Sequence, residues 1–95
     1  MATYILLSTL TDDGAETLAK NPERITAVNK EVEAMGVRVL QQYAVLGPFD
    51  FVSIVEAPDN QTVAHMSIHL SQRGSIRIQT LAAIPVEQFI AGLKK

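Results

Sequence analysis

The chain has 95 residues and no cysteine, with 47% hydrophobic and 19% charged side chains. This length predicts one domain over residues 1–95, and the lack of cysteine excludes disulfides, thiolate metal ligands and a thiol nucleophile. Eight basic against ten acidic side chains give a net charge of −2, which leaves no basic excess for binding nucleic acid.

The first predicted element is a strand over residues 4–10, a short apolar run that ends before a polar turn. Because such a strand is apolar on both faces, it needs a cover on each side. We expect helices on one face and a second subunit on the other. The two faces consist of Tyr4, Leu6 and Leu10, and of Ile5 and Leu7.

A helical spacing of apolar residues replaces this alternation after residue 12. It predicts a short helical turn and then a main helix over residues 22–35, begun by Pro22 and ended by a left-handed cap at Gly36. The stripe that this helix directs at the sheet consists of Ile25, Val28, Val32 and Met35.

Residues 37–46 and 51–57 are predicted to form an antiparallel hairpin, because turn residues separate two apolar runs. Strict alternation assigns the residues of the first run to two faces. These are Val37, Val39, Tyr43 and Val45 on one face, and Leu40, Ala44 and Leu46 on the other.

A second helix over residues 60–72 and a last strand over residues 75–84 follow. Ile68 lies outside the apolar stripe of this helix, where it is either a lone exposed side chain or a subunit contact. Residues 85–95 form a tail, and we expect its short helix to dock on an apolar surface. The faces of the last strand are Ile76, Ile78, Thr80 and Ala82, and Arg77, Gln79 and Leu81.

This order of elements is that of the ferredoxin-like α+β fold, βαββαβ, with a four-stranded antiparallel sheet and two helices on one face. The other face would expose an apolar patch on the order of several hundred Å². Two such sheets packed face to face form a dimeric α/β barrel, with a cavity between the sheets or between sheet and helices. We therefore expect a homodimer or higher homo-oligomer that pairs through the open sheet face.

The hairpin also resembles a known family. Its segment Leu46-Gly47-Pro48-Phe49-Asp50-Phe51-Val52 resembles the Gly-Tyr-Asp turn of the GYD-domain family, and Pro22-Glu23-Arg24 and Glu56-Ala57-Pro58-Asp59 resemble other segments of it. The resemblance implies the dimeric α/β-barrel group and a family in which most members have no assigned activity. Phe49 stands where the family has tyrosine, so no role for a phenolic O–H is expected there.

Asp50 is the first candidate for chemistry. Its carboxylate either accepts backbone N–H groups and fixes the turn, or lies at the mouth of a cavity as a proton acceptor or a group that orients a substrate. His65 and His69, four residues apart on a helix, either share a metal ion or form a polar flank or subunit contact. No third ligand is evident, so we expect no metal and no cofactor.

Two strand residues complete the predicted ligand set. Arg77 pairs with an acid across an interface, lies at a sheet edge or awaits an anionic ligand. Tyr43 either packs half-buried or acts as a catalytic acid. Arg24, which begins the main helix, is either solvated or held in a salt bridge. The predicted ligand-binding residues are Tyr43, Phe49, Asp50 and Arg77.

Together these patterns predict a small cytoplasmic homo-oligomer that binds an unidentified, partly apolar small molecule in the barrel cavity. No apolar run approaches the roughly 18 residues of a membrane span, so a membrane is not an expected partner, nor is nucleic acid. One alternative is a cofactor-free monooxygenase- or isomerase-type enzyme of the dimeric barrel group, in which Asp50 or His65 transfers protons. Another is an assembly module without a ligand.

Overall fold

The computed structural model describes residues 1–94, which form four strands and four helices. The strands β1 (Ala2–Leu10), β2 (Arg38–Ala44), β3 (Phe51–Ala57) and β4 (Ile76–Ala83) make one antiparallel sheet in the order β2-β3-β1-β4. The helices are α1 (Asp12–Lys20), α2 (Arg24–Ala34), α3 (Asn60–Ser71) and α4 (Val86–Leu93). The predicted ferredoxin-like α+β topology is confirmed.

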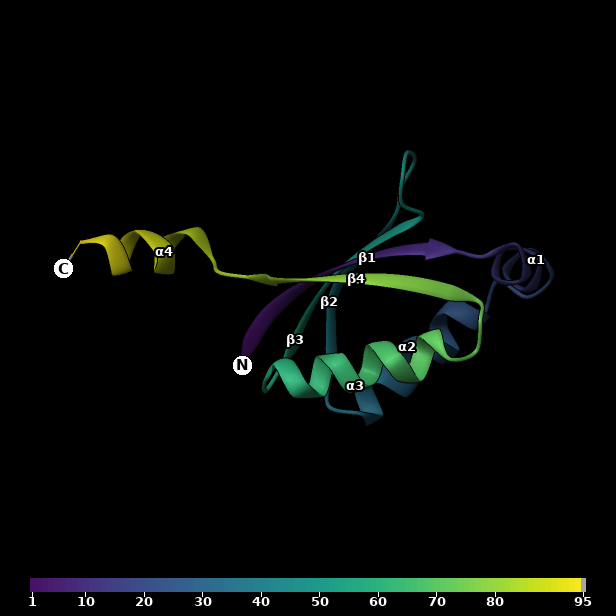
Figure 1. Cartoon of the computed structure of the whole chain (residues 1–95), viewed down its shortest axis with the longest axis horizontal. Helices are drawn as coiled ribbons and strands as arrows, with labels where there is room; N and C mark the ends of the chain where they lie inside the picture. Colours follow the sequence, from purple (N-terminus) through teal and green to yellow (C-terminus); the bar gives the residue numbers. More distant parts are fainter. Residues whose placement is uncertain (95) are drawn as a thin grey trace.

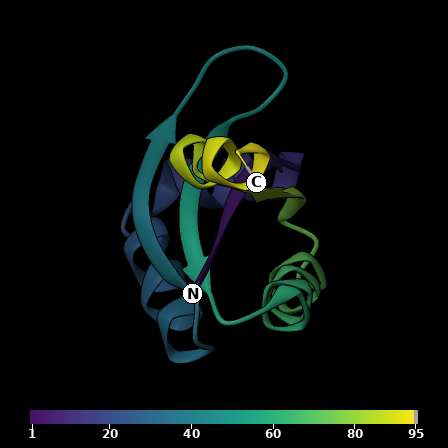
Figure 2. The same cartoon turned by 90° about the vertical axis from the view of Figure 1, so that its left-hand side faces the viewer.

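The sheet has a covered face and an open face. Helices α2 and α3 both lie beneath the sheet in Figure 1, and Figure 2 shows them at opposite sides of the molecule. Helix α1 lies at one end of the sheet and is a full helix, where the sequence predicts only a short turn. The Thr11 side chain explains the difference, because it caps the helix by accepting the Gly14 N–H.

The core lies between the sheet and α2 and α3. The inward residues of β1 and β3 alternate with outward ones, as the sequence predicts for β1, and they pack on the apolar stripes of the helices. Tyr4 is buried here, and its hydroxyl donates a hydrogen bond to Asn60 Oδ1 at 2.6 Å. The buried apolar residues are Tyr4, Leu6, Val32, Val37, Val55, Ala57, Val63, Met66 and Leu70.

The open face is also apolar at its centre. Strand pairing places Ile54, Ile5 and Leu81 in one row across β3, β1 and β4. The neighbouring row holds Val52 and Leu7, which are half-buried like Ile5 and Ile54 although no helix covers them. The prediction of a strand that is apolar on both faces is therefore confirmed for β1.

The predicted faces of β2 are wrong in part. The pairing of β2 with β3 shifts between Val39 and Gln41, so Leu40 is an extra residue in the strand. Such a bulge reverses the facing of all residues that follow. Val39 pairs with Val55 on the helix side, whereas Tyr43 pairs with Val52 on the open side.

The predicted tail helix exists as α4, and it does not dock on the rest of residues 1–94. The chain leaves β4 through Pro85, whose backbone is extended, and α4 lies beyond the end of the sheet (Figure 1). Its apolar side chains stay exposed, with Phe89 at 55% and Leu93 at 71%. The molecule is accordingly elongated, with extents of 53 × 29 × 19 Å.

Candidate functional site

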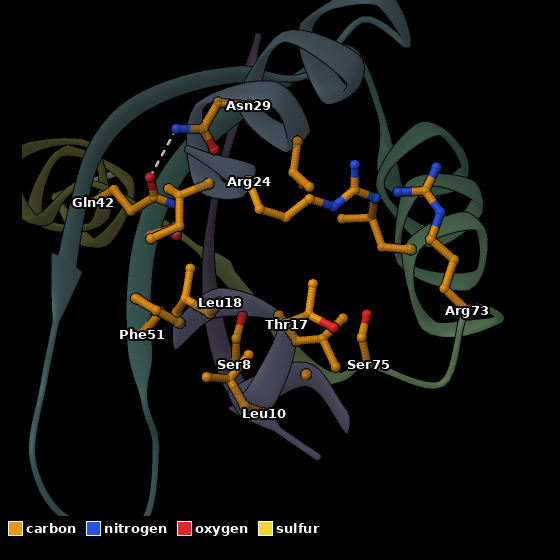
Figure 3. Close-up of a pocket in the computed structure, with 16 residues that line it drawn as sticks. Ser8, Leu10, Thr17, Leu18, Arg24, Asn29, Gln42, Phe51, Arg73 and Ser75 are labelled. Carbon is orange, nitrogen blue, oxygen red and sulfur yellow. Dashed lines mark hydrogen bonds between the residues drawn. The ribbon is translucent and has the colours of Figure 1, made fainter. Parts of the chain in front are cut away.

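A pocket lies between the covered face of the sheet and the helices (Figure 3). Its cavity volume is about 120 Å³. β1, β2 and β3 form one wall, α2 the opposite wall, and α1 and the start of β4 close one end. The apolar lining includes Leu10, Leu18, Ile25, Val28, Phe51, Leu70 and Ile76.

A tight backbone contact holds α1 over this pocket. The Thr11 N–H donates to the Ser75 carbonyl at 3.1 Å, and the Thr11 hydroxyl donates to the Gly74 carbonyl at 2.7 Å. A Cβ at Gly14 would overlap the carbonyl oxygen of Ser75. The first turn of α1 therefore reaches the start of β4 only because this position is glycine.

Two arginines lie at the mouth of the pocket. Figure 3 shows the guanidinium groups of Arg24, at the start of α2, and Arg73, just after α3, pointing toward one another. Arg73 is held by Glu31 of α2 in a two-point ion pair, of which one contact, Nη1 to Oε1, is 2.8 Å. Arg24 forms no ion pair with any side chain in residues 1–94.

The Glu31 carboxylate is the negative member of this cluster. Hydrogen bonds from Arg73 first, and then from His69 at 3.0 Å, lower the pKa of Glu31 from 4.5 to about 2. The same ion pair raises the pKa of Arg73. Glu31, Arg73 and His69 together join α2 to the C-terminal end of α3, beside the pocket mouth.

Polar groups also line the pocket interior. Ser8 and Ser53 are inward residues of β1 and β3 and are only 5% and 4% exposed. Gln42 Nε2 donates to Ser53 Oγ at 3.2 Å, and Gln42 Oε1 accepts a hydrogen bond from Asn29 Nδ2 at 2.8 Å. This chain of hydrogen bonds links β3 and β2 to α2 and so connects the two opposite walls.

The predicted ligand set does not meet in this pocket. Tyr43 and Arg77 lie on the open face at opposite edges of the sheet, in β2 and β4. Phe49 and Asp50 precede β3 in the hairpin loop, where Asp50 Oδ2 accepts the Leu10 N–H at 2.8 Å. Neither Asp50 nor the exposed His65 lines the pocket.

The two histidines have separate surroundings. His69 contacts Glu31 and lies 3.4 Å from Arg73, whereas His65 is exposed on α3. Residues 1–94 contain no group of three or more His, Cys, Asp or Glu side chains that could hold a metal ion.

The sequence does contain a signal for the interior serines. Each is a polar residue at an inward position of a strand that is otherwise apolar, Ser8 in β1 and Ser53 in β3. The sequence identifies Arg24 only as a residue at the start of a helix. Arg73 and Glu31 are 42 residues apart, so nothing in their spacing indicates a pair.

Comparison with known proteins identifies relatives along the whole chain. The GYD domain model matches residues 4–93. A protein of Thermus thermophilus, named glutamine synthetase and cystathionine beta-lyase binding protein, is 64% identical over 95 residues, which cover 99% of this chain and 100% of the relative.

Solved structures share the fold. TTHA0845 from Thermus thermophilus has a TM-score of 0.57 at 24% identity and covers 90% of this chain and 95% of its own. FFRP-DM1 has a TM-score of 0.55 at 23% identity, and the match covers 88% of this chain and 100% of that chain. At these identities the likeness shows the fold alone. In the part of the chain that the structure describes, no helix has the length and apolar character needed to span a bilayer.

Proposed function

The chain belongs to the GYD domain family. Within this family, we propose that it is a homo-oligomeric binding protein whose partners are enzymes. The observation that carries this proposal is its 64% identity, over nearly the full length of both chains, with a protein named for binding glutamine synthetase and cystathionine beta-lyase. Glutamine synthetase and cystathionine beta-lyase are therefore the first partners to test.

The surface of the single chain supports self-association. Its accessible area is 6508 Å², whereas a compact monomer of 10.4 kDa is expected to expose only about 5,400 Å². The radius of gyration is 14.4 Å, against roughly 12.4 Å for a compact chain of this length. The excess of about 1,100 Å² is comparable to the roughly 800 Å² that each partner buries in a standard interface.

A second copy of this chain is the occupant proposed for the open face. Leu7, Val52 and Ile54 form an apolar centre there, with Arg77 and the Arg38–Glu56 pair toward the edges. An apolar centre with a polar rim is the usual anatomy of a protein interface. Pairing of two such faces gives the dimeric barrel that the sequence predicts.

Helix α4 is proposed to pack on the same second copy. Its linker from β4 is two residues long and runs away from its own sheet (Figure 1). The large side chains on it, Val86, Phe89, Ile90 and Leu93, gain burial only from another molecule. An exposed arm next to a self-pairing face is well placed to wrap around the partner.

Binding to the two enzymes tests the proposed function directly. The purified chain is immobilised and exposed to glutamine synthetase and to cystathionine beta-lyase of the same organism, with an unrelated oligomeric enzyme as control. Saturable binding of at least one named enzyme, absent for the control, is the expected result. If neither enzyme binds at about 50 µM, the proposal is wrong.

We also propose that the pocket between sheet and helices holds a small molecule. The pocket itself supports this second function, since it is mostly apolar and carries a few convergent polar groups. Benzyl alcohol is a suitable neutral probe, and amide NMR shifts at Ser8, Val28 and Ser53 should report its binding. Val28→Phe fills the space and should abolish those shifts. Equal shifts in both proteins would contradict a ligand in this pocket.

A further inference from the structure

The charged groups at the mouth of the pocket indicate what kind of molecule it takes. Among residues 1–94, Arg24 and Arg73 are the only charged residues that line the pocket, and no carboxylate lines it. Glu31, outside the lining, offsets the charge of Arg73 through the two-point ion pair. Arg24 stays without an ion-pair partner in residues 1–94, so the mouth carries one uncompensated positive charge.

One uncompensated guanidinium suits a monoanion better than a dianion. A guanidinium is planar and binds a carboxylate through two parallel hydrogen bonds. A phosphate monoester would bring nearly two negative charges to a mouth with one free cation and the nearby Glu31 carboxylate. The electrostatics therefore favour a single carboxylate.

The interior sets the size and polarity of the remainder of the ligand. A cavity of about 150 Å³ lined by apolar side chains binds benzene, and the pocket here measures about 120 Å³. Its floor and walls are mainly aliphatic, with Phe51 from β3. An apolar group of about six non-hydrogen atoms therefore fits inside.

We propose that this pocket binds a small monocarboxylic acid, with its carboxylate on Arg24 at the mouth and its apolar body against Val28, Phe51 and Ile76. This inference rests on the proposed small-molecule function and adds the chemical class of the ligand. Arg73 contributes a second guanidinium beside the carboxylate while Glu31 holds it in place.

Benzoate and benzyl alcohol form a matched pair of probes, because they share the ring and differ mainly in charge. Affinities are measured by amide NMR titration at low ionic strength for the wild type, Arg24→Gln and Lys30→Gln. Lys30 is an exposed cation of the same helix that does not line the pocket, so its variant is the control. Thermal unfolding checks that each variant is folded.

The wild type and Lys30→Gln should bind benzoate roughly tenfold more tightly than benzyl alcohol. Arg24→Gln should lose this preference while its affinity for benzyl alcohol stays unchanged. Equal affinity for the two probes, unchanged by Arg24→Gln, would overturn the carboxylate assignment and leave the small-molecule function standing. If neither probe binds at about 10 mM, both proposals fail together.

Discussion

Gly14 shows how one residue determines the shape of the pocket. Its missing side chain lets the first turn of α1 lie against the Ser75 carbonyl, and this contact closes one end of the cavity. No other residue type leaves that space, so a larger side chain must push α1 away from β4.

We expect Gly14→Ala to lower Tm by at least roughly 4–8 °C, equivalent to about 1 kcal/mol or more, because backbone atoms cannot yield as a flexible side chain would. Differential scanning calorimetry measures the change. Ala15→Ser is the control, since Ala15 is the exposed neighbour on the same helix. If Gly14→Ala and Ala15→Ser unfold at the same temperature, α1 does not pack against β4 as described.

Asp50 joins the hairpin loop to the end of β1, which favours the structural of its two predicted roles. Asp50→Ala leaves the Leu10 N–H without its partner and should cost about 1 kcal/mol, or a Tm decrease of roughly 4–8 °C. Asp50→Asn keeps an acceptor oxygen, so its Tm should decrease less than that of Asp50→Ala. Equal Tm values for all three proteins would argue that the carboxylate is free for another role.

Glu31 predicts a pH dependence of stability. Its pKa is about 2 in the folded chain against an ordinary value of 4.5, so its ion pairs stabilise the fold above pH 4.5 and are lost as pH falls toward 2. Thermal unfolding between about pH 5 and pH 2.5 should show a shallower loss of Tm for Glu31→Gln than for the wild type. Glu33→Gln, on the same helix, should keep the wild-type slope.

At the scale of elements, alternation predicted the faces of β1 and β4 correctly because these strands pair without interruption. It failed in β2, where the extra residue Leu40 moves Tyr43 to the open face. A bulge depends on pairing with another strand, and the sequence of one strand does not contain that information. The predicted ligand set combined two residues of the open face with two residues of the loop, and none of the four lines the pocket.

Helix α4 is the element whose role is most easily separated from the fold of the single chain. Phe89→Asp places a charge on its apolar stripe and should raise the dimer dissociation constant by roughly tenfold or more. The helix content measured by circular dichroism should change little, because α4 lies away from the body of the chain.

Sedimentation equilibrium measures the dissociation constant of the Phe89→Asp protein. Glu87→Gln is the control on the same helix. Equal dissociation constants for the two variants would show that α4 does not contact the second copy.

At the scale of the whole molecule, the order of elements predicted the fold, whereas the pocket depends on contacts between distant residues. Arg24, Arg73 and Glu31 come from two helices and the turn after one of them, and only the placing of both helices on one face of the sheet brings them together. Self-association, in contrast, was predicted from the chain length and the strand pattern. A chain of this size with two apolar strand faces has more apolar surface than two helices cover.

Sedimentation velocity of the wild-type chain at about 10 µM tests the central claim most directly, because assembly depends on protomer concentration. Pairing through the open face and α4 predicts a particle of at least twice 10.4 kDa. A single species of 10.4 kDa, with Leu7, Ile54 and Phe89 accessible to solvent, would contradict it.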